Sequence, residues 1–535
     1  MGSLPPPSAL PPPTAIMWRT PGGGRGGVGK SVLAVNMAVY LAQLGRSVVL
    51  VDADPAGAEL HTMLGLPPAG DPGRAGDRSP SAKADDGSDE GDERELDPVP
   101  TQVPGLKLLP QLYRVGSTVP VRPGSKPRWA RHLRQLDADY VLLDLGSGTL
   151  PSTLDLFLMA DLGLCVTAPE PPSIEATYRF MRALFLRVMR RLFVTDRFKM
   201  RLFERAQADL GPLPSPQDLV RALARYDTSL ANQGAVELAQ MQARLVVNGA
   251  RLRTDVDLGP AMCDMSTRYL GVTFDYVGHI EQDDSVWLSV VRRRPLLIDS
   301  PTSKSARNLE RIARRVLALF AAKPSKQAEA PIPLIPHEPS LYDLLLTHRG
   351  ATDEDVRRAY KRQREIYLSG SLPLTSLLDE DQLRSEQARI EEAHDTLLDP
   401  IRRKAYDAST FPDEAEARPM RPSIPDTALE AERELLRQEL SREINAETEF
   451  TGSLLRKVRE SQGIEIEDIA KHTKISLAHL KAIEVEAFGE LPALVYTRGF
   501  VQEVAKFLKL DVAQVTRTYL RRFKTARSSE GDTNP

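Results

Sequence analysis

A glycine-rich segment near the start of the 535-residue chain constrains the fold more than any other feature. From Gly24 the sequence reads GRGGVGKS, which matches the pattern G-x-x-x-x-G-K-S/T. In this pattern the glycines let backbone N–H groups curl around phosphate oxygens, the lysine reaches the outer phosphates and the hydroxyl binds Mg²⁺. An apolar helix, KSVLAVNMAVYLAQLG, follows and ends at Gly45. Because its N-terminus points at the loop, the segment predicts a phosphate site.

Two buried strands with carboxylates at their ends support this interpretation. SVVLVDADP ends in Asp52 and Asp54, and DYVLLDLGSGT ends in Asp144, followed by Gly146. Carboxylates at the carboxyl ends of parallel strands, beside a phosphate loop, can position Mg²⁺ or an attacking water. The order strand, loop, helix, strand predicts a doubly wound α/β P-loop domain with a mostly parallel sheet. Asp144 is expected to hold Mg²⁺ through water.

Composition limits the class of protein. The formal net charge is −3, and the two cysteines, Cys165 and Cys263, have no CxxC spacing. These features exclude a disulfide framework and a cysteine-rich metal site, and they fit a reducing compartment. The sequence shows neither a signal-peptide pattern nor an apolar run of membrane-spanning length. We therefore expect a cytoplasmic protein.

Three polar or proline-rich breaks divide the chain, and the blocks between them carry enough apolar residues to form cores. The expected organisation is a disordered tail at 1–13, a P-loop block at 14–322 with a disordered acidic insertion at 67–100, a proline-rich linker at 323–339, a helical block at 340–410, a linker and charged helix at 411–446, a third block at 447–524 and a disordered tail at 525–535. The third block and the helical block are both expected to be small and all-α.

The P-loop block resembles the MinD/ParA family of bacterial deviant Walker A ATPases, most closely its FlhG branch. The motifs that carry the resemblance, besides the loop, include VTAPEPPSIEATYRFMRALF, RLVVNGARLRTDVDLG and GHIEQDDSVWLSVVRRRPLLIDSP. It spans about residues 22–320, apart from the acidic insertion and a stretch near 195–240. The resemblance implies a homodimer that forms face to face around two ATP molecules, hydrolyses ATP slowly when a partner stimulates it, and uses the cycle as a positional switch.

The resemblance also assigns roles to residues. Arg25 replaces the family lysine that reaches across the dimer to the partner's ATP; it keeps the charge, but its planar fork differs from an ammonium group. Asp54 is expected to contact Mg²⁺ or the attacking water, and Asp52 is expected to support the Asp54 carboxylate. Asn248 lies at the position where members of the family have an asparagine that contacts the adenine base. We expect the nucleotide to be bound by Gly24, Gly26, Gly27, Val28, Gly29, Lys30, Ser31, Val32, Pro169, Glu170 and Asn248, with Mg²⁺ on Ser31, Asp54 and Asp144.

The strand before the loop is interrupted. It reads AIMWRTPGGG, with Arg19 and Pro21 close to the glycines. Proline cannot donate to a central ladder, so we expect Pro21 to lie just beyond the strand.

The helical block predicts an antiparallel hairpin in which Thr352 caps the first long helix and Asp355 completes the cap. Residues 340–408 resemble a J domain. The His-Pro-Asp tripeptide expected after Tyr367 is replaced by Leu368, Ser369 and Gly370. That tripeptide carries the stimulation of DnaK-type chaperones, so we expect no such stimulation and interpret the block as a docking or spacer module.

The third block predicts a helix-turn-helix from EIEDIAKHT and SLAHLKAIE, with Ser476 capping the second helix. It resembles the cytoplasmic domain of RodZ proteins, which docks on an actin-like filament. The second helix offers His479 and Lys481 but also Glu484, and no Arg, Asn or Gln. We favour docking to a protein partner, such as a cytoskeletal one, through residues 447–524. DNA binding is the alternative.

A basic amphipathic segment, YRFMRALFLRVMRRLFVTDRFKMRLFERA, can be interpreted in two ways. It can lie on an anionic membrane surface, or its apolar face can be part of the ATPase core, which is the interpretation we favour.

The sequence as a whole predicts a regulatory ATPase that positions a polar, motility, division or cytoskeletal assembly, recruited to a pole, the nucleoid or the inner membrane surface. A transcription regulator whose DNA contact is gated by ATP is the second hypothesis. A scaffold that binds ATP without hydrolysing it is the third.

Overall fold

The computed structural model describes residues 16–19, 27–54, 60–67, 98–109, 133–321, 339–411, 440, 444, 448–464 and 466–531. These residues form two compact units, Met1–Ala313 with Gln327–Pro422 and Arg314–Lys326 with Ser423–Pro535. The expectations for Gly24, Arg25, Gly26 and Pro21, for most of the acidic insertion and for most of the charged helix at 426–447 lie outside the described residues.

A five-stranded sheet forms one half of the α/β core, with the strand order β1-β5-β2-β4-β3. All neighbours are parallel except β3, which runs antiparallel to β4. The apolar runs VVLVDA and YVLLDL form the two central strands because their side chains are buried on both faces. The strands are β1 (Ile16–Arg19), β2 (Val48–Ala53), β3 (Val99–Pro100), β4 (Leu106–Leu109) and β5 (Tyr140–Leu145).

A second, three-stranded parallel sheet has the order β6-β7-β8. Its strands are β6 (Leu164–Thr167), β7 (Gln242–Ala250) and β8 (Thr273–Glu281). Because β6 lies beside β1, the parallel strands of both sheets end at a common edge, with β1 between β5 and β6. An edge of this kind, where the strand order reverses, is where ligands bind in open α/β sheets.

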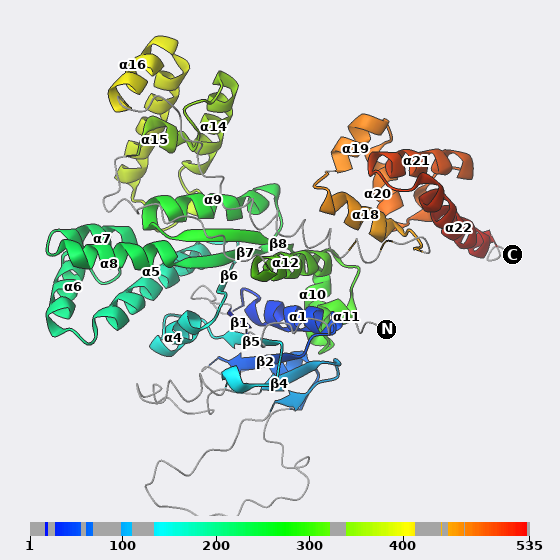
Figure 1. The fold of residues 1–535 in the computed structure, drawn as a ribbon, viewed down its shortest axis with the longest axis horizontal. Helices are drawn as coiled ribbons and strands as arrows, with labels where there is room; N and C mark the ends of the chain where they lie inside the picture. The colour runs from blue at the N-terminus through cyan, green and yellow to red at the C-terminus, as the bar shows by residue number, and fades with distance from the viewer. Residues whose placement is uncertain are drawn as a thin grey trace, which may run out of the picture. The chain divides into compact units, whose positions relative to one another are not determined.

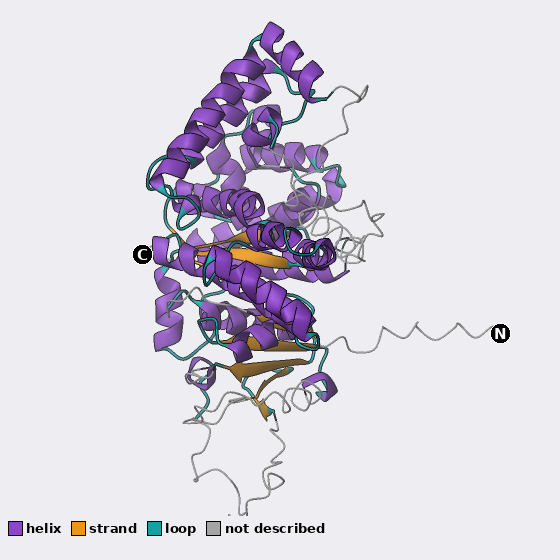
Figure 2. Cartoon of the chain, turned by 90° about the vertical axis from the view of Figure 1, so that its left-hand side faces the viewer, coloured by secondary structure: helices purple, strands orange, loops and turns teal. Residues whose placement is uncertain are grey.

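Helices cover both faces of the sheets (Figures 1 and 2). The mostly parallel α/β fold expected from the sequence is therefore confirmed. The helices that belong to this part are α1 (Lys30–Gln43), α2 (Leu60–Met63), α4 (Pro151–Met159), α5 (Pro171–Phe193), α6 (Arg197–Leu210), α7 (Pro216–Ala224), α8 (Thr228–Gln240), α9 (Arg253–Leu270), α10 (Asp284–Val291), α11 (Leu296–Asp299) and α12 (Lys304–Ala321).

The stretch near 195–240, to which the family resemblance does not extend, folds as the three helices α6, α7 and α8. Asp196 and Asp227 cap α6 and α8 through their carboxylates, which accept backbone N–H groups of the first turn. Phe203, Leu219 and Leu223 are fully buried and belong to the same core as α5 and β7. The segment is therefore an integral layer of the ATPase-like part.

The helical block consists of α13 (Leu341–Leu345), α14 (Asp353–Ile366), the short 3-10 helix η1 (Leu372–Leu374), α15 (Glu380–Leu398) and α16 (Pro400–Thr410). We call residues 339–411 the hairpin module. Thr352 and Asp355 form the expected capping box, and Ile390, Ala393 and Leu397 are buried against α14. The predicted hairpin is confirmed, whereas its likeness to a J domain stays a prediction.

The hairpin module shares a core with the α/β part, which corrects the expectation of a separate block. Ala261 and Met265 of α9 are buried in the same cluster as the module's own apolar side chains. Next to this core the hydroxyls of Tyr269 and Tyr367 lie 2.6 Å apart. Arg268 of α9 donates to Glu386 of α15 at 2.5 Å, with both side chains 13% exposed. The sequence pattern within the module could not reveal this, because half of the contact lies on α9.

Two further boundaries differ from the sequence expectations. Val99–Pro100, assigned to the disordered insertion, forms β3 and pairs with β4. Residues 525–531, assigned to a disordered tail, continue α22 (Val512–Gly531). In α22, polar residues extend a helix that begins in an apolar stretch, so composition ends the helix too early. The strand β3 has only two residues and is defined by its pairing with β4, so composition alone does not mark it.

The second unit contains the expected helix-turn-helix, α19 (Ile466–Thr473) followed by α20 (Leu477–Val485). Ile469, Leu480 and Ile483 are buried, and the Ser476 hydroxyl caps α20 by accepting the backbone N–H of His479. The Tyr519 hydroxyl of α22 donates to the carbonyl of Ile483 and joins α22 to α20. The remaining elements are α18 (Gly452–Ser461), η2 (Phe488–Glu490) and α21 (Leu494–Phe507). None of the helices in the described part of the chain has the length and apolarity needed to span a bilayer.

The buried ion pair at the hairpin module gives a stability prediction. Arg268→Ala removes the buried guanidinium from Glu386, which keeps Arg389 and the Tyr269 hydroxyl as partners, so the free energy of unfolding should fall by about 1.5–3 kcal/mol. Urea unfolding followed by tryptophan fluorescence measures this in the full chain, because the described tryptophans, Trp18 and Trp287, lie in the first unit.

Arg362→Ala is the matched control. It breaks an ion pair that joins another helix of the hairpin module, α14, to Asp264 of α9, but Arg362 is 53% exposed, so the expected loss is below about 1 kcal/mol. Equal losses in the two variants would contradict the assignment of Arg268 as the residue that fixes the module.

Candidate phosphate and magnesium site

The end of the glycine-rich loop forms a tight cradle at the start of α1. Gly27 and Gly29 have φ angles of 97° and 86°, a left-handed conformation that favours glycine. A Cβ atom on Gly29 would lie 2.2 Å from the Asn248 side-chain nitrogen, so a larger residue would displace the Asn248 side chain. The loop therefore needs glycine both for its backbone shape and for its contact with β7.

The N-terminus of α1 is open toward this cradle. No side chain caps it, and the first turn contains no acidic residue. The first N–H groups of a helix have no partner inside the helix, and they carry the positive end of its dipole. An α1 start without a side-chain cap, held by two left-handed glycines, fits a phosphate group.

Lys30, the first residue of α1, is buried with only 9% of its surface exposed. Burial lowers the pKa of the Lys30 ammonium group below its ordinary value of 10.5, while the charges of Asp144 and Asp54 act in the opposite direction. A buried lysine is costly unless negative groups surround it. Here the negative groups are Asp144 and Asp54, which lie at the ends of the two central strands.

Asp52 and Asp144 are direct neighbours in the register of β2 and β5, and they are 2% and 3% exposed. Burial is the main cause that raises the pKa of Asp52 to about 7, and the neighbouring charge of Asp144 adds to it. Two adjacent carboxylates in a low-dielectric site repel each other, and a cation relieves this repulsion. The pair therefore favours a bound cation.

Asp54 follows β2 and reaches the turn after β5. A Cβ atom on Gly146 would lie 2.2 Å from an Asp54 carboxylate oxygen, so glycine at 146 lets the Asp54 side chain approach this turn closely. The structure thus brings Asp52, Asp54, Asp144 and Lys30 together at one edge of the sheet, as the sequence predicted. Ser31 lies in the first turn of α1, next to Lys30.

Asn248 near the end of β7 has a contact that the sequence did not reveal. Its side-chain amide donates to the backbone carbonyl of Val28 at 2.8 Å. The residue therefore fixes the glycine-rich loop to the second sheet. Its expected contact with adenine stays a prediction. Asn36 makes a similar link, because its side-chain oxygen accepts the backbone N–H of Leu297 and ties α1 to α11.

Pro169 and Glu170 lie in the turn between β6 and α5, at the same sheet edge. The Ser173 hydroxyl accepts the backbone N–H of Ala168 at 2.9 Å and lies 3.1 Å from the Thr167 hydroxyl, which holds this turn in place. Glu170 is exposed and Pro169 is half-buried. Their expected role in covering a base stays a prediction.

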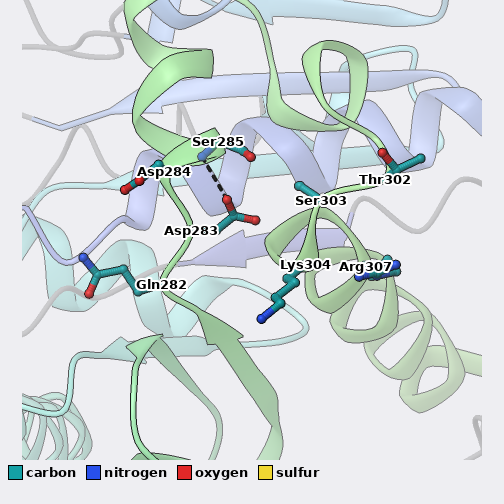
Figure 3. A pocket seen from close by; sticks show the side chains of 8 residues that line it. All are labelled: Gln282, Asp283, Asp284, Ser285, Thr302, Ser303, Lys304 and Arg307. Atoms are coloured by element: carbon teal, nitrogen blue, oxygen red, sulfur yellow. Dashed lines mark hydrogen bonds between the residues drawn. The ribbon is translucent and has the colours of Figure 1, made fainter. Parts of the chain in front are cut away.

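An open polar pocket of about 490 Å³ follows the carboxyl end of β8 (Figure 3). Asp283, Asp284 and Ser285 enter it from the start of α10, and Lys304 and Arg307 enter from the start of α12. Burial alone would raise the pKa of Asp283, but hydrogen bonds from Ser285, Ser305 and Lys304 outweigh it, so its pKa lies below the ordinary value. The Asp-Asp-Ser sequence after β8 is a helix-cap signal that could have pointed to the start of α10 from the sequence alone.

The described residues fit Mg²⁺ only together with other oxygen ligands. Among them, no group of three or more His, Cys, Asp or Glu side chains could hold a metal alone. Mg²⁺ is commonly held by one or two carboxylates together with substrate phosphates and water. Asp144 and the Ser31 hydroxyl, beside the open start of α1, provide that kind of partial set.

Comparisons with known proteins agree with this geometry in both units. Residues 22–89 match a family described as NUBPL iron-transfer P-loop NTPase, within the ParA group, and residues 454–515 match a helix-turn-helix domain family.

Individual relatives match the same two parts of the chain. The antiactivator FleN of Pseudomonas aeruginosa is 25% identical over 297 residues, which cover 55% of this chain and 84% of FleN. The cytoskeleton protein RodZ of Streptococcus pneumoniae is 38% identical over 60 residues, which cover 11% of this chain and 22% of RodZ. A structure of the septum site-determining protein MinD with Mg-ADP, from Pyrococcus horikoshii, aligns at 18% identity and a TM-score of 0.34, covering 58% of this chain and 99% of that one.

The match to the ParA group includes the glycine-rich loop and β2, and the match to FleN extends over 297 residues. The N-terminal part of the chain is therefore homologous to the MinD/ParA P-loop ATPases, and it is followed by a RodZ-like helix-turn-helix domain.

Proposed function

We propose that this chain is an ATP-binding switch that hydrolyses ATP slowly, dimerises with ATP and positions or regulates a cellular assembly through its C-terminal helical parts. The observation that carries the proposal is the buried Lys30 at the uncapped start of α1, beside Asp52, Asp54 and Asp144. FleN is named an antiactivator, which favours a regulatory role for its relative. The proposed site of action is the cytoplasm.

Each residue of the site has a separate role in the proposed hydrolysis. The N–H groups at the start of α1 and the Lys30 ammonium bind the β- and γ-phosphates and offset their charge. Ser31 and Asp144 hold Mg²⁺, which when bound neutralises charge that develops on the phosphate oxygens. Asp54, at the turn after β2, orients water. The buried Asp52, two residues earlier in the chain, supports the Asp54 carboxylate.

Exposed apolar side chains at the carboxyl edge of the sheets support a dimer that closes over this edge. Leu150, Leu252 and Trp287 are 52%, 66% and 66% exposed. They follow β5, β7 and β8, so they surround the strand ends that carry the site. Exposed large apolar side chains around a site are typical of an interface. The proposed role of Arg25, contact with the partner's phosphates, rests on the family resemblance alone.

The surface of the helix-turn-helix favours protein docking over DNA binding. Arg459 of α18 donates to Glu484 of α20 at 2.6 Å, and His479 stacks on Phe500 with ring centroids 5.3 Å apart. Of the three polar side chains that could face a groove, only Lys481 is exposed. Val495 and Tyr496 of α21 are 78% and 66% exposed. Exposed apolar side chains next to a second helix with one exposed donor match a protein partner better than base edges.

Iron transfer, which the name of the matching P-loop family mentions, is not part of the proposal. Cys165 and Cys263 are both buried, and burial raises the pKa of the Cys263 thiol. Metal transfer needs accessible thiolates.

Lys30→Ala should reduce ATP turnover by at least about tenfold, because it removes the charge that faces the phosphates. Turnover is measured with the full chain and Mg²⁺, alone and with DNA or vesicles as stimulators. Lys361→Ala, an exposed lysine on α14, is the control and should hydrolyse ATP as the wild type does. Equal turnover in wild type and Lys30→Ala would support a scaffold that does not hydrolyse ATP.

The alternative function is a transcription regulator whose DNA contact is gated by ATP. A gel shift with residues 447–531, which include the whole of α22, separates the two functions. Because electrostatic contacts weaken steeply with salt, we expect no sequence-specific shift at physiological salt. A specific shift that survives this salt and is lost in Lys481→Ala would favour the regulator.

A further inference from the structure

Three apolar side chains are exposed where α5 ends and α6 begins. Leu192 is 37% exposed, Val194 67% and Phe198 66%. We call residues 190–201, which contain them, the α5–α6 corner. Figure 1 shows α6 at the left-hand periphery of the first unit.

These side chains are not needed by the core. Phe185, Met189 and Phe193 of α5 are fully buried, so the apolar face of this helix packs inside the protein as the sequence analysis favoured. From α6, Phe203 packs against Phe193 with ring centroids 6.0 Å apart. The corner is therefore anchored from both helices, while Leu192, Val194 and Phe198 remain outside.

The charge around these apolar side chains is strongly positive. Residues 190–201 contain one acidic residue, Asp196, and its carboxylate accepts the backbone N–H groups of Phe198 and Lys199. No ion pair involves the basic side chains of the corner in the part of the chain that the structure describes. These side chains are Arg190, Arg191, Arg197, Lys199 and Arg201.

We propose that the α5–α6 corner docks on the surface of an anionic lipid bilayer. Basic side chains contact the lipid phosphates, while Leu192, Val194 and Phe198 enter the boundary between headgroups and acyl chains. Nucleic acid is a poorer match, because binding to its phosphates needs only the basic residues and leaves two exposed aliphatic side chains without a role.

The corner is well separated from the nucleotide edge. The 23-residue helix α5 starts directly after Pro169 and Glu170 and ends at the corner. At 1.5 Å per residue its ends lie about 35 Å apart. Membrane docking therefore leaves the carboxyl edge of the sheets free for nucleotide and for a second copy of the chain.

The test is co-sedimentation of the full chain with vesicles. Vesicles of phosphatidylglycerol and phosphatidylethanolamine should bind the protein, and phosphatidylcholine vesicles should not. Binding should weaken as salt is added, because salt screens exposed charges. A chain that remains in the supernatant with phosphatidylglycerol vesicles would overturn the proposal.

Two pairs of substitutions test the two parts of the surface. Arg197→Glu with Arg201→Glu should weaken vesicle binding at least about tenfold. Val194→Asp with Phe198→Asp should also weaken it about tenfold, because these side chains lose their contact with the acyl chains. All four positions are exposed, so folding should be retained, and circular dichroism checks this.

Matched controls carry the same changes elsewhere on the first unit. Arg357→Glu with Arg364→Glu reverses two exposed charges of α14, and Val236→Asp changes an exposed apolar residue of α8. Both controls should bind vesicles as the wild type does. Equal losses in controls and corner variants would contradict a specific corner site.

Duplex DNA provides the remaining comparison. If the corner charges bind DNA while Val194→Asp with Phe198→Asp leaves all binding unchanged, the surface is a nucleic-acid site and the proposal is wrong. Basal ATP turnover without vesicles should be unchanged in every corner variant. This readout separates a failure of the membrane proposal from a failure of the proposed ATPase function.

Discussion

The burial of Lys30 beside three carboxylates is the constraint on which the site depends. Two of the carboxylates, Asp52 and Asp144, are neighbours on adjacent central strands, and the register of β2 and β5 holds them side by side. Burial and mutual repulsion raise the pKa of Asp52 to about 7. Such a cluster is stabilised by cations and by the lysine above it. Nucleotide with Mg²⁺ would supply both the cation and the phosphate charge that the uncapped start of α1 can bind.

The glycine-rich loop is also connected to parts of the protein far from it in sequence. Asn248 holds the carbonyl of Val28 from β7. The next element after β7 is α9, whose far end carries Arg268 and Tyr269 in contact with the hairpin module. A single strand and helix thus lie between the glycine-rich loop and that module. The arrangement connects the hairpin module directly to the carboxyl edge of the sheets.

Local sequence patterns predicted the features that depend on neighbours in the chain. The loop glycines, the aspartates at strand ends, the cap at Thr352 and the buried face of the helix-turn-helix all follow from spacing within one or two elements. Contacts that join distant segments were not predictable in this way. The Asn248 bond to Val28, the sharing of a core between α9 and the hairpin module and the pairing of Glu484 with Arg459 each need the tertiary structure. The sequence marked the basic amphipathic segment as one that could lie on a membrane surface, but periodicity does not show which apolar side chains stay exposed where α5 ends.

The central claim is that ATP controls the association of two chains through the site at the carboxyl edge. The most direct test is the molecular mass of an Asp54→Ala variant, in which hydrolysis is impaired, measured by light scattering with and without ATP and Mg²⁺. The account predicts that ATP doubles the mass, and that adding Arg25→Ala abolishes this effect while ATP still binds. A mass that ATP leaves unchanged in the Asp54→Ala variant would contradict the account.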